Sequence, residues 1–536
     1  MVIIKQKDKR SGLTYAYKSE SYWDKEKKQP RSRRKLIGRV DEKTGKIVPT
    51  DGRGKRRKQT SEKKQKRGPV PATKARRVFY GATYLLDQIG EQLGLTEDLK
   101  HCFPRHYQQI LSIAYYMILE HPSPLSRFEK WDHLHKHPYG KNVTSQRSST
   151  VFSSLSEEGR NRFFSCCKKR CQENEYWAYD TTSISSYSEV LKQVAYGKNK
   201  EDDRLPQINL ALIFGETSGL PFYYRKLAGN IPDVKTVLNL LGDFKALGFE
   251  KIKLVMDRGF YSEANINALM KKHLKFLISV RTSLSWVRKE LDKVYDGLDT
   301  FENLNEQYDL YALTVRTNWN YTQDRPYKGD RIKAKRRVYL HLYYNVDQAA
   351  EDQKKFDRKL MRHHQELKTG KRVPEHEAFY KKYFTVKSTP KRGVQITVNH
   401  QAVEKAKRYY GYFSLLSNEK MDAIQALEIY RGKDPIEKCF GDIKERMNLR
   451  RMLVSSEATL DGKLFVGFVG LILLAHIKTK MQAQKLFKDY TLQSLLDKLD
   501  VIEAFESPGS ALRVGEILND QKYIYKALDI PLPSDV

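Results

Sequence analysis

The chain has 536 residues, of which 98 are Lys or Arg and 65 are Asp or Glu, so its formal net charge at pH 7 is +33. A hydrophobic content of 40% and an aromatic content of 11% are typical of a globular protein and exclude an intrinsically disordered chain. A charge this large favours nucleic acid as a partner, with a ribosomal-type protein, a membrane-surface protein or mere solubility as the alternatives.

The segment 1–77 is the most basic part of the chain, with 27 Lys and Arg against 8 Asp and Glu, or +19 of the total. Alternating polar and apolar residues at 13–17 and 35–40, followed by Ile47-Val48, predict a small β-meander. Residues 51–75 are polar, basic and contain Gly and Pro, which predicts a linker that is flexible until it meets DNA. We therefore expect residues 1–77 to be a DNA-binding arm whose affinity depends strongly on salt.

The next segment, residues 78–172, has apolar residues at helical spacing. The stretches that show it are YGATYLLDQIGEQLGL, QQILSIAYYMILE and GRNRFFSCCKKRCQEN. We predict a helical region here, with a role in DNA binding or dimerisation.

Residues 173–282 have a different pattern, in which three strands come first and helices and strands then alternate. The expected strands are 176–185, 208–214, 220–229, 251–257 and 275–281, and the expected helices are 234–248 and 262–272. This order predicts an α/β fold with a mixed sheet covered by helices.

Residues 283–405 interrupt that rhythm with strand-like pieces at 308–319 and 336–345, followed by a charged helix at 349–367. We predict a β-rich insertion domain. The pattern resumes in 406–482 with a strand (GYFSLLSN), one long helix from Met421 to Met447 and an apolar helix at 461–480. Residues 483–536 predict a C-terminal helical region.

Two aspartates end apolar strands of this predicted sheet. Asp180 follows Tyr176-Trp177-Ala178-Tyr179, and Asp257 follows Leu254-Val255-Met256. Carboxylates at the ends of neighbouring strands can converge on one point, and such oxygen ligands suit Mg²⁺ ions that catalyse phosphoryl transfer. The alternative is that each aspartate is an ordinary turn or helix-cap residue.

A third acid, Glu437, lies within the predicted long helix. Tyr430, Lys433, Glu437 and Lys444 are separated by steps of three, four and seven, which places them on one helical face. A carboxylate between two cations suits a metal ligand beside groups that contact phosphate. The alternative is an ordinary face of salt bridges.

These motifs resemble the DDE transposases of bacterial insertion sequences, which have an RNase H-like core. The family signature is Tyr, two residues, Arg, three residues, Glu, six residues, Lys; here Tyr430, Glu437 and Lys444 keep the spacing, and Lys433 stands in the Arg position. The segments Gly229–Asp233 and Asp257–Phe260 add to the resemblance, which covers residues 176–282 and 405–480. Lys cannot reproduce the planar, two-pronged hydrogen bonding of Arg.

The resemblance implies an RNase H-like mixed sheet in 173–282 and 406–482, interrupted by a β-rich insertion between Asp257 and Glu437. Insertions in this family can offer an aromatic side chain that stacks on a flipped base. Trp319 and Trp286 are the candidates, with ordinary packing of each ring as the alternative.

The function that the resemblance implies is excision and insertion of an insertion sequence by phosphodiester hydrolysis and 3′-OH strand transfer. Asp180, Asp257 and Glu437 would hold two Mg²⁺ ions, for which Mn²⁺ can substitute. Tyr430, Lys433, Lys444 and Arg258 would position double-stranded DNA, namely the terminal inverted repeats and the target, in a synaptic homodimer. The alternatives are an RNase H-like nuclease without strand transfer and a domesticated, non-catalytic DNA-binding protein.

The remaining features predict a reducing, cytoplasmic setting without a membrane partner, and the resemblance implies a bacterial, nucleoid-associated protein. The first residues lack the apolar core of a signal peptide, and the longest apolar run, Leu464–Ala475, is too short to span a bilayer and predicts a buried helix. His363 and His364 together with His376 could bind a metal, but they lie in a strongly charged segment without a matching fourth ligand, so we interpret the segment as a solvated face. The five cysteines form no C-x-x-C pair, so we expect buried free thiols; they are Cys102, Cys166, Cys167, Cys171 and Cys439.

Overall fold

The chain forms two compact units, residues 1–72 and 73–536. The computed structural model describes residues 2–9, 11–25, 27–42, 44–49, 75–172, 174–188, 190–200, 204–249, 252–325, 329–389, 393–451, 453–507 and 511–534. Apart from residue 75, the predicted linker at 51–75 lies outside the described residues.

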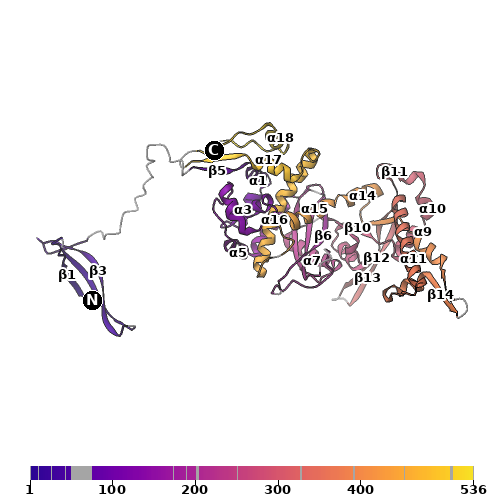
Figure 1. Ribbon diagram of the computed structural model, residues 1–536, viewed down its shortest axis with the longest axis horizontal. Coiled ribbons are helices and arrows are strands. Elements are labelled where there is room, and N and C mark those ends of the chain that lie inside the picture. The colour runs from indigo at the N-terminus through magenta and orange to yellow at the C-terminus, as the bar shows by residue number, and fades with distance from the viewer. Residues whose placement is uncertain are drawn as a thin grey trace. The chain divides into compact units, whose positions relative to one another are not determined.

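The first unit contains an antiparallel sheet whose strands pair in chain order, which confirms the predicted meander (Figure 1). Its strands are β1 (Val2–Lys7), β2 (Thr14–Asp24), β3 (Gln29–Val40) and β4 (Ile47–Val48). The basic residues at the start of β3 are exposed. They are Arg31, Arg33, Arg34 and Lys35.

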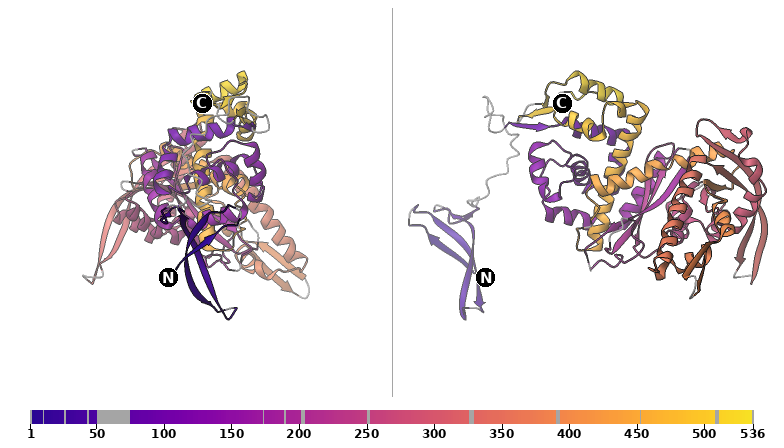
Figure 2. Two further views of the ribbon diagram at one scale, coloured as in Figure 1. Left: turned by 90° about the vertical axis from the view of Figure 1, so that its left-hand side faces the viewer. Right: turned by 45° about the vertical axis from the view of Figure 1, so that its right-hand side comes forward.

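The second unit begins with the predicted helical region, whose first, third and fifth helices pack against the long helix α16 (Glu457–Ala483) (purple and yellow in Figure 2, right). A short strand, β5 (Arg76–Phe79), precedes them. The helices are α1 (Gly81–Gln92), α2 (Leu95–Cys102), α3 (Tyr107–Leu119), α4 (Phe128–Leu134), α5 (Ser145–Ser154) and α6 (Glu157–Cys167). By length and composition α16 could cross a membrane, but 83% of its apolar window is buried inside the protein, which confirms the predicted buried helix.

A nine-stranded mixed sheet forms the centre of the second unit, and this confirms the predicted mixed sheet with helices. Its first part consists of β6 (Tyr176–Ser185), β7 (Gln207–Gly215), β8 (Pro221–Ala228), α7 (Asp233–Leu247), β9 (Lys253–Met256), α8 (Glu263–Lys271) and β10 (Lys275–Val280). β6, β7 and β8 are antiparallel neighbours, whereas β9 runs parallel to both β6 and β10.

The inserted segment 283–405 contains the predicted strand-like pieces, and these pieces are part of the central sheet. Its two long strands, β12 (Leu310–Arg325) and β13 (Asp330–Tyr344), extend the central sheet through β16 (Tyr412–Ser417), because Leu416 of β16 pairs with both Leu340 and Ile278. The sequence pattern cannot reveal pairing between strands that lie so far apart in the chain. The other elements are α9 (Ser285–Asp292), α10 (Tyr295–Leu298), β11 (Leu304–Asn305), α11 (Val346–Lys368), α12 (Glu377–Tyr383), β14 (Phe384–Thr389), β15 (Gly393–Val398) and α13 (His400–Lys407).

The prediction of one long helix at 421–447 is wrong in one respect. The structure has two helices here, α14 (Ala423–Arg431) and α15 (Asp434–Gly441), and a π-helical turn (Asp442–Arg446) follows α15. Pro435 lies in the first turn of α15, where its missing N–H costs nothing, whereas within a continuous helix it would remove a hydrogen bond and clash with the preceding turn.

The C-terminal region, predicted to be helical, contains α17 (Leu492–Asp500) and α18 (Asn519–Ala527) but also two strands. β17 (Glu503–Glu506) pairs with β18 (Arg513–Val514) and with β5, which comes from the very start of the second unit. A short strand of sequence EAFE offers too little pattern to be recognised without its distant partner.

Candidate active site

Asp180 lies on the face of β6 that is turned away from α7. Side chains alternate along a strand: Tyr179 donates a hydrogen bond to Thr236 on α7 (2.7 Å), and the next residue therefore points to the other face. Burial raises the pKa of Asp180 to about 6, an effect opposed by the nearby Lys200 ammonium and by the Thr181 N–H, which donates to Oδ1 (2.7 Å).

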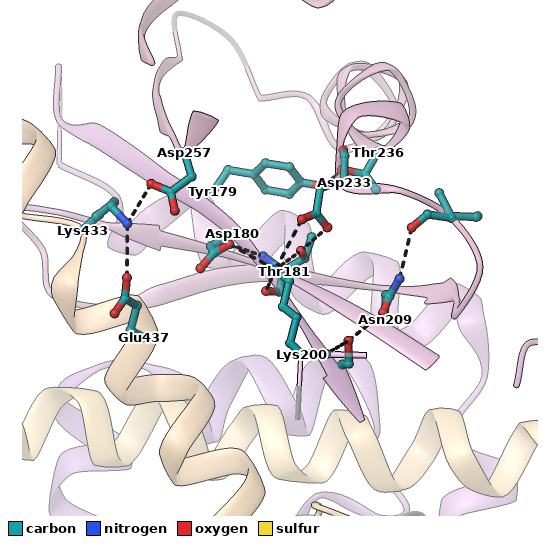
Figure 3. Close-up of polar contacts among 12 residues, drawn as sticks. Tyr179, Asp180, Thr181, Lys200, Asn209, Asp233, Thr236, Asp257, Lys433 and Glu437 are labelled. Carbon is teal, nitrogen blue, oxygen red and sulfur yellow. Dashed lines mark hydrogen bonds and ion pairs between the residues drawn. The ribbon is translucent and has the colours of Figure 1, made fainter. Parts of the chain in front are cut away.

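Asp257 lies beside Asp180 because β6 and β9 are parallel neighbours. Tyr179 pairs with Met256 in this register, so the next residue on each strand is one of the two acids. The two carboxylates therefore lie side by side (Figure 3). Asp257 directly follows the last residue of β9, as predicted, but the prediction that Asp180 ends its strand is wrong, because β6 continues to Ser185 in its pairing with β7.

Glu437 shares a contact with Asp257, because both carboxylates lie beside the ammonium group of Lys433. Lys433 Nζ lies 2.9 Å from Asp257 Oδ1 and 3.2 Å from Glu437 Oε1, so one cation bridges two acids that are far apart in the sequence (Figure 3). Burial lowers the pKa of Lys433, but the hydrogen bond and charge of Asp257 outweigh it and raise the pKa above its usual value. Tyr430 completes this side by donating a hydrogen bond to Asp257 Oδ1.

The break between α14 and α15 positions this group. Lys433 is the N-cap residue of α15, and Glu437 lies in the first turn of that helix. The buried side chains of α15 include Ile436, Cys439 and Phe440, and the helix packs against β6 and β7. The predicted shared face of Tyr430, Lys433 and Glu437 is thus realised across two helices.

A second lysine, Lys200, lies on the other side of Asp180, and sequence analysis did not identify it. Its Nζ is 3.8 Å from Asp180 Oδ1 and 3.4 Å from Asp233 Oδ2, and it donates to the Thr181 carbonyl (2.6 Å). Asp233 at the start of α7 also accepts a hydrogen bond from Thr181 Oγ1 (2.5 Å). Asp233 belongs to a segment that the family resemblance includes, whereas Lys200 stands in a loop without a sequence pattern.

A cavity of about 440 Å³ opens at this edge of the sheet. Asp180 and Asp257 line it together with Asp233, and basic residues form much of the remaining wall. These basic residues are Lys198, Lys200, Arg258 and Arg281. The structure therefore places Arg258, one of the predicted DNA-contacting residues, beside the two aspartates.

Lys444 lies outside the α-helix on which its predicted position depended. It lies in the π-helical turn after α15, where the α-helical period no longer holds, and it is half-buried. The α-helical spacing that predicted a shared face with Glu437 therefore does not extend through this turn, and the contact of Lys444 with DNA stays a prediction.

Trp286 and Trp319 pack against each other edge to face, with ring centroids 5.8 Å apart. Trp319 Nε1 donates to Asn267 (2.9 Å), and only 7% of this residue is exposed, which favours the packing alternative for Trp319. Trp286 Nε1 donates to the hydroxyl of Tyr261 (3.0 Å), and its ring is half-buried. Base stacking by Trp286 stays a prediction.

The side chains at this edge fit divalent cations. Carboxylate oxygens are the hard ligands that Mg²⁺ and Mn²⁺ take. Two ammonium groups, of Lys200 and Lys433, lie among Asp180, Asp233, Asp257 and Glu437, which shows that the acids together require positive charge.

Comparison with known proteins gives a family but no detailed homologue. No curated protein sequence matches the chain. One solved structure, a cryo-EM structure of the piggyBac transposase synaptic complex with hairpin DNA, covers 84% of this chain and 76% of that chain at 9% identity and a TM-score of 0.34, too low to support structural inference. A family model for the transposase DDE domain matches residues 177–473, more than half of the chain. The chain therefore belongs to the DDE transposase family.

Proposed function

We propose that the protein cuts and rejoins DNA ends as the transposase of a bacterial insertion sequence, with Asp180, Asp257 and Glu437 as ligands of two Mg²⁺ ions. The observation that carries this proposal has two parts: Asp180 and Asp257 lie side by side on neighbouring strands, and Lys433 bridges Asp257 to Glu437 on a distant helix. We also propose that β6 to β10 form an RNase H-like core, since their order is β8-β7-β6-β9-β10 with only the last two connections parallel.

Each residue around the acids would have a defined role. Two bound Mg²⁺ or Mn²⁺ ions would activate the attacking oxygen and stabilise the leaving oxygen of the phosphodiester. Tyr430 orients Asp257 through its hydrogen bond, and Lys433 balances the charge of Asp257 and Glu437. Arg258 is exposed at the cavity and is suited to bind a DNA phosphate through its planar guanidinium.

The partner would be double-stranded DNA, both the terminal inverted repeats and the target. The net charge of +33 supports a polyanionic partner, and the exposed basic residues of β3 provide phosphate contacts in the first unit. We propose a synaptic homodimer acting in the bacterial cytoplasm, associated with the nucleoid.

The proposal is tested by conservative substitution of the acids. Asp180→Asn, Asp257→Asn and Glu437→Gln should each abolish cleavage of element-end DNA in Mg²⁺ while leaving end binding nearly unchanged, because the amides keep the shape but lose the charge that holds the ions. Glu445→Gln is the matched control, since Glu445 is an exposed acid of the same helical segment whose carboxylate pairs with Arg450. Normal cleavage by any of the three acid variants would contradict the site.

A second assay separates the alternatives. An element end with a pre-cut 3′-OH should join to target DNA, and its failure to join while hydrolysis proceeds would indicate a nuclease. Specific binding of element ends without hydrolysis would indicate a non-catalytic DNA-binding protein.

A further inference from the structure

A cluster of His363, Glu366 and His376 lies in the inserted segment, on α11 and on the short 3₁₀ turn Pro374–His376 that precedes α12. Sequence analysis interpreted this segment as a solvated face, and that interpretation is wrong for His363, which is fully buried. The charged pattern of α11 hides it because the neighbours of His363 on the helix are mostly exposed.

Three potential ligand atoms converge in this cluster. His363 Nδ1 lies 2.8 Å and His376 Nδ1 2.9 Å from the same oxygen, Glu366 Oε2, and the two imidazole rings are 4.2 Å apart. All three ligand atoms lie within 4.8 Å of one another. In a tetrahedral zinc site with bonds near 2.0–2.1 Å, ligand atoms are roughly 3.3 Å apart. The two imidazole–carboxylate distances would therefore widen by about half an ångström, and ligand atoms that lie as much as 4.8 Å apart would move closer together.

The surrounding structure fixes these side chains. His363 and Glu366 are one helical turn apart on α11, and His376 approaches across the turn that reverses the chain. Tyr380 on α12 donates a further hydrogen bond to Glu366 Oε2 (2.5 Å) and accepts one from the Val373 N–H (3.3 Å). Such a partner orients a metal-binding carboxylate.

His363 makes its polar contact within the cluster through Nδ1, whereas Glu366 and His376 are accessible to solvent. Nε2 of His363 is buried and has no hydrogen-bond partner among the described residues, so Nδ1 is the ring nitrogen with polar neighbours. Glu366 lines a hollow of about 330 Å³ at the surface of α11, and His376 is 34% exposed in its side chain. An ion can therefore reach the cluster from solvent.

We propose that His363, Glu366 and His376 bind a transition-metal ion, Zn²⁺ in the first place, at a site separate from the acids at the edge of the central sheet. Two imidazoles and one carboxylate are a donor set for Zn²⁺ rather than for Mg²⁺, and three protein ligands leave a fourth position for water. Nδ1 of each histidine must be free of a proton to bind the ion: an imidazole that carries one proton keeps it on Nε2, whereas an imidazolium releases one proton to solvent.

The ion would connect α11 to the turn before α12. These two elements enclose a small apolar cluster that includes Leu367 and Tyr380, and the loop between them spans only residues 369–373. A metal bond across this junction would stabilise the helical part of the inserted segment, from which β14 and β15 extend. The site does not depend on the proposed transposase function.

Metal binding by the full chain tests the site directly. The protein, carrying Asp257→Asn to disable the acids as metal ligands, is stripped with chelator and titrated with Zn²⁺ by calorimetry and with Co²⁺ by its visible spectrum. We expect one equivalent to bind, with the Co²⁺ spectrum of a tetrahedral site. Hydrogen exchange should slow in α11 and α12 when Zn²⁺ is added.

Substitutions identify the ligands. His376→Ala should abolish this equivalent without unfolding the chain, because His376 is partly exposed, and Glu366→Gln should do the same. His364→Ala is the matched control: this half-buried neighbour has its ring 5.8 Å from that of Phe384 and should leave binding unchanged. Tyr380→Phe should weaken binding by about tenfold, as loss of an outer-shell partner does.

Two results would overturn the proposal. Either the unsubstituted cluster takes up no Zn²⁺ or Co²⁺ at micromolar concentrations, or the His376→Ala chain binds the ion as tightly as the parent does. In both cases the two histidines would serve only as hydrogen-bond partners of the Glu366 carboxylate and not as metal ligands.

Discussion

At the scale of single residues, the candidate site depends on which cation lies beside which acid. Lys433 occupies the position where the family signature has Arg, and its compact ammonium bridges Asp257 and Glu437. A guanidinium forms two parallel hydrogen bonds to one carboxylate, whereas an ammonium acts as a point charge. Lys433 is only 10% exposed in its side chain, so its charge is not that of an ordinary surface ion pair.

Substitutions of Lys433 should therefore change catalysis. Lys433→Arg should keep or raise the cleavage rate, since it restores the family's residue, whereas Lys433→Glu should strongly reduce cleavage and weaken end binding. Single-turnover cleavage and end-binding titrations measure the two effects. If Lys433 contributed only as a surface ion pair, worth about 0.3–0.5 kcal/mol, the Lys433→Glu rate would stay within roughly twofold of the parent.

Lys200 should set the pH dependence of the site. Asp180 must be ionised to hold a cation, but burial raises the pKa of its carboxyl to about 6. The nearby positive charge of Lys200 opposes this effect. Lys200→Ala should raise this pKa further, so the rise of the cleavage rate with pH, measured between pH 5 and 8 at subsaturating Mg²⁺, should move to higher pH. Lys235→Ala, which removes an exposed lysine of α7, should leave the profile in place. An unshifted profile in the Lys200 variant would show that Lys200 is not coupled to Asp180.

At the scale of secondary structure elements, the junction between α14 and α15 determines where Glu437 lies. Gly432 is half-buried at this junction, and a Cβ built on it would lie 2.4 Å from Glu216 Oε1 and 2.7 Å from two carbons of the same side chain. Its φ of −57° would suit any residue, so the lack of space and not the backbone favours glycine.

A pair of glycine substitutions tests this junction. Gly432→Ala should displace the flexible end of the Glu216 side chain, and cleavage should fall by roughly tenfold or more if α15 moves with it, because small displacements of a catalytic group are costly. Gly441→Ala, at the other end of α15 where no atom lies within 4 Å of the new Cβ, should keep full activity and raise stability by about 0.4–1 kcal/mol. Equal activity of the two variants would mean that the junction tolerates movement.

The strand β13 carries a buried histidine that should make stability depend on pH. His341 is fully buried, its Nδ1 lies 2.9 Å from Thr314 Oγ1, and burial lowers its pKa to about 4. As the pH falls from about 6.5 to about 4, the unfolded chain takes up the proton that the folded chain refuses. The stability that this neutral histidine contributes is therefore present above pH 6.5 and is lost on acidification, by up to on the order of 3 kcal/mol.

The comparison of parent and His341→Gln isolates this effect, since other groups cancel in the difference. Denaturant titrations at pH 7 and pH 5 should show that the free energy of unfolding falls more steeply in the parent than in the variant. A difference that does not change with pH would show that His341 is not buried and neutral in the folded state.

At the scale of the whole molecule, positive charge is concentrated in the N-terminal arm. Residues 1–77 hold +19 of the net charge. The end of this segment belongs to the second unit, however, because β5 at 76–79 pairs with β17. A deletion that ends at residue 72 therefore removes the first unit without disturbing this pairing.

This deletion should weaken DNA binding and flatten its dependence on salt. The slope of log K against log salt is about −0.9 per phosphate neutralised, so a change of slope counts the contacts that the arm makes. Binding of element ends, measured between low and physiological salt, gives both slopes. An unchanged slope would show that the arm serves another partner or solubility.

Local patterns in the sequence determined the elements of the central sheet and two of the acids. The aromatic run at the start of β6 precedes Asp180 and the apolar run of β9 precedes Asp257, and the parallel pairing of the two strands then brings these residues together. The spacing around Glu437 identified the third acid even though the helix is broken, because Tyr430, Lys433 and Glu437 all lie within two turns.

Only the tertiary structure decided the features that depend on contacts between distant segments. The hairpin of β12 and β13 joins the central sheet through β16, and Lys200 reaches Asp180 from a loop without a pattern. The burial of His363 likewise depends on α12, which packs over a helix whose own sequence is mostly charged. Periodicity reports which face of an element is apolar, but not which distant segment covers it, and that pairing is set by packing of the whole chain.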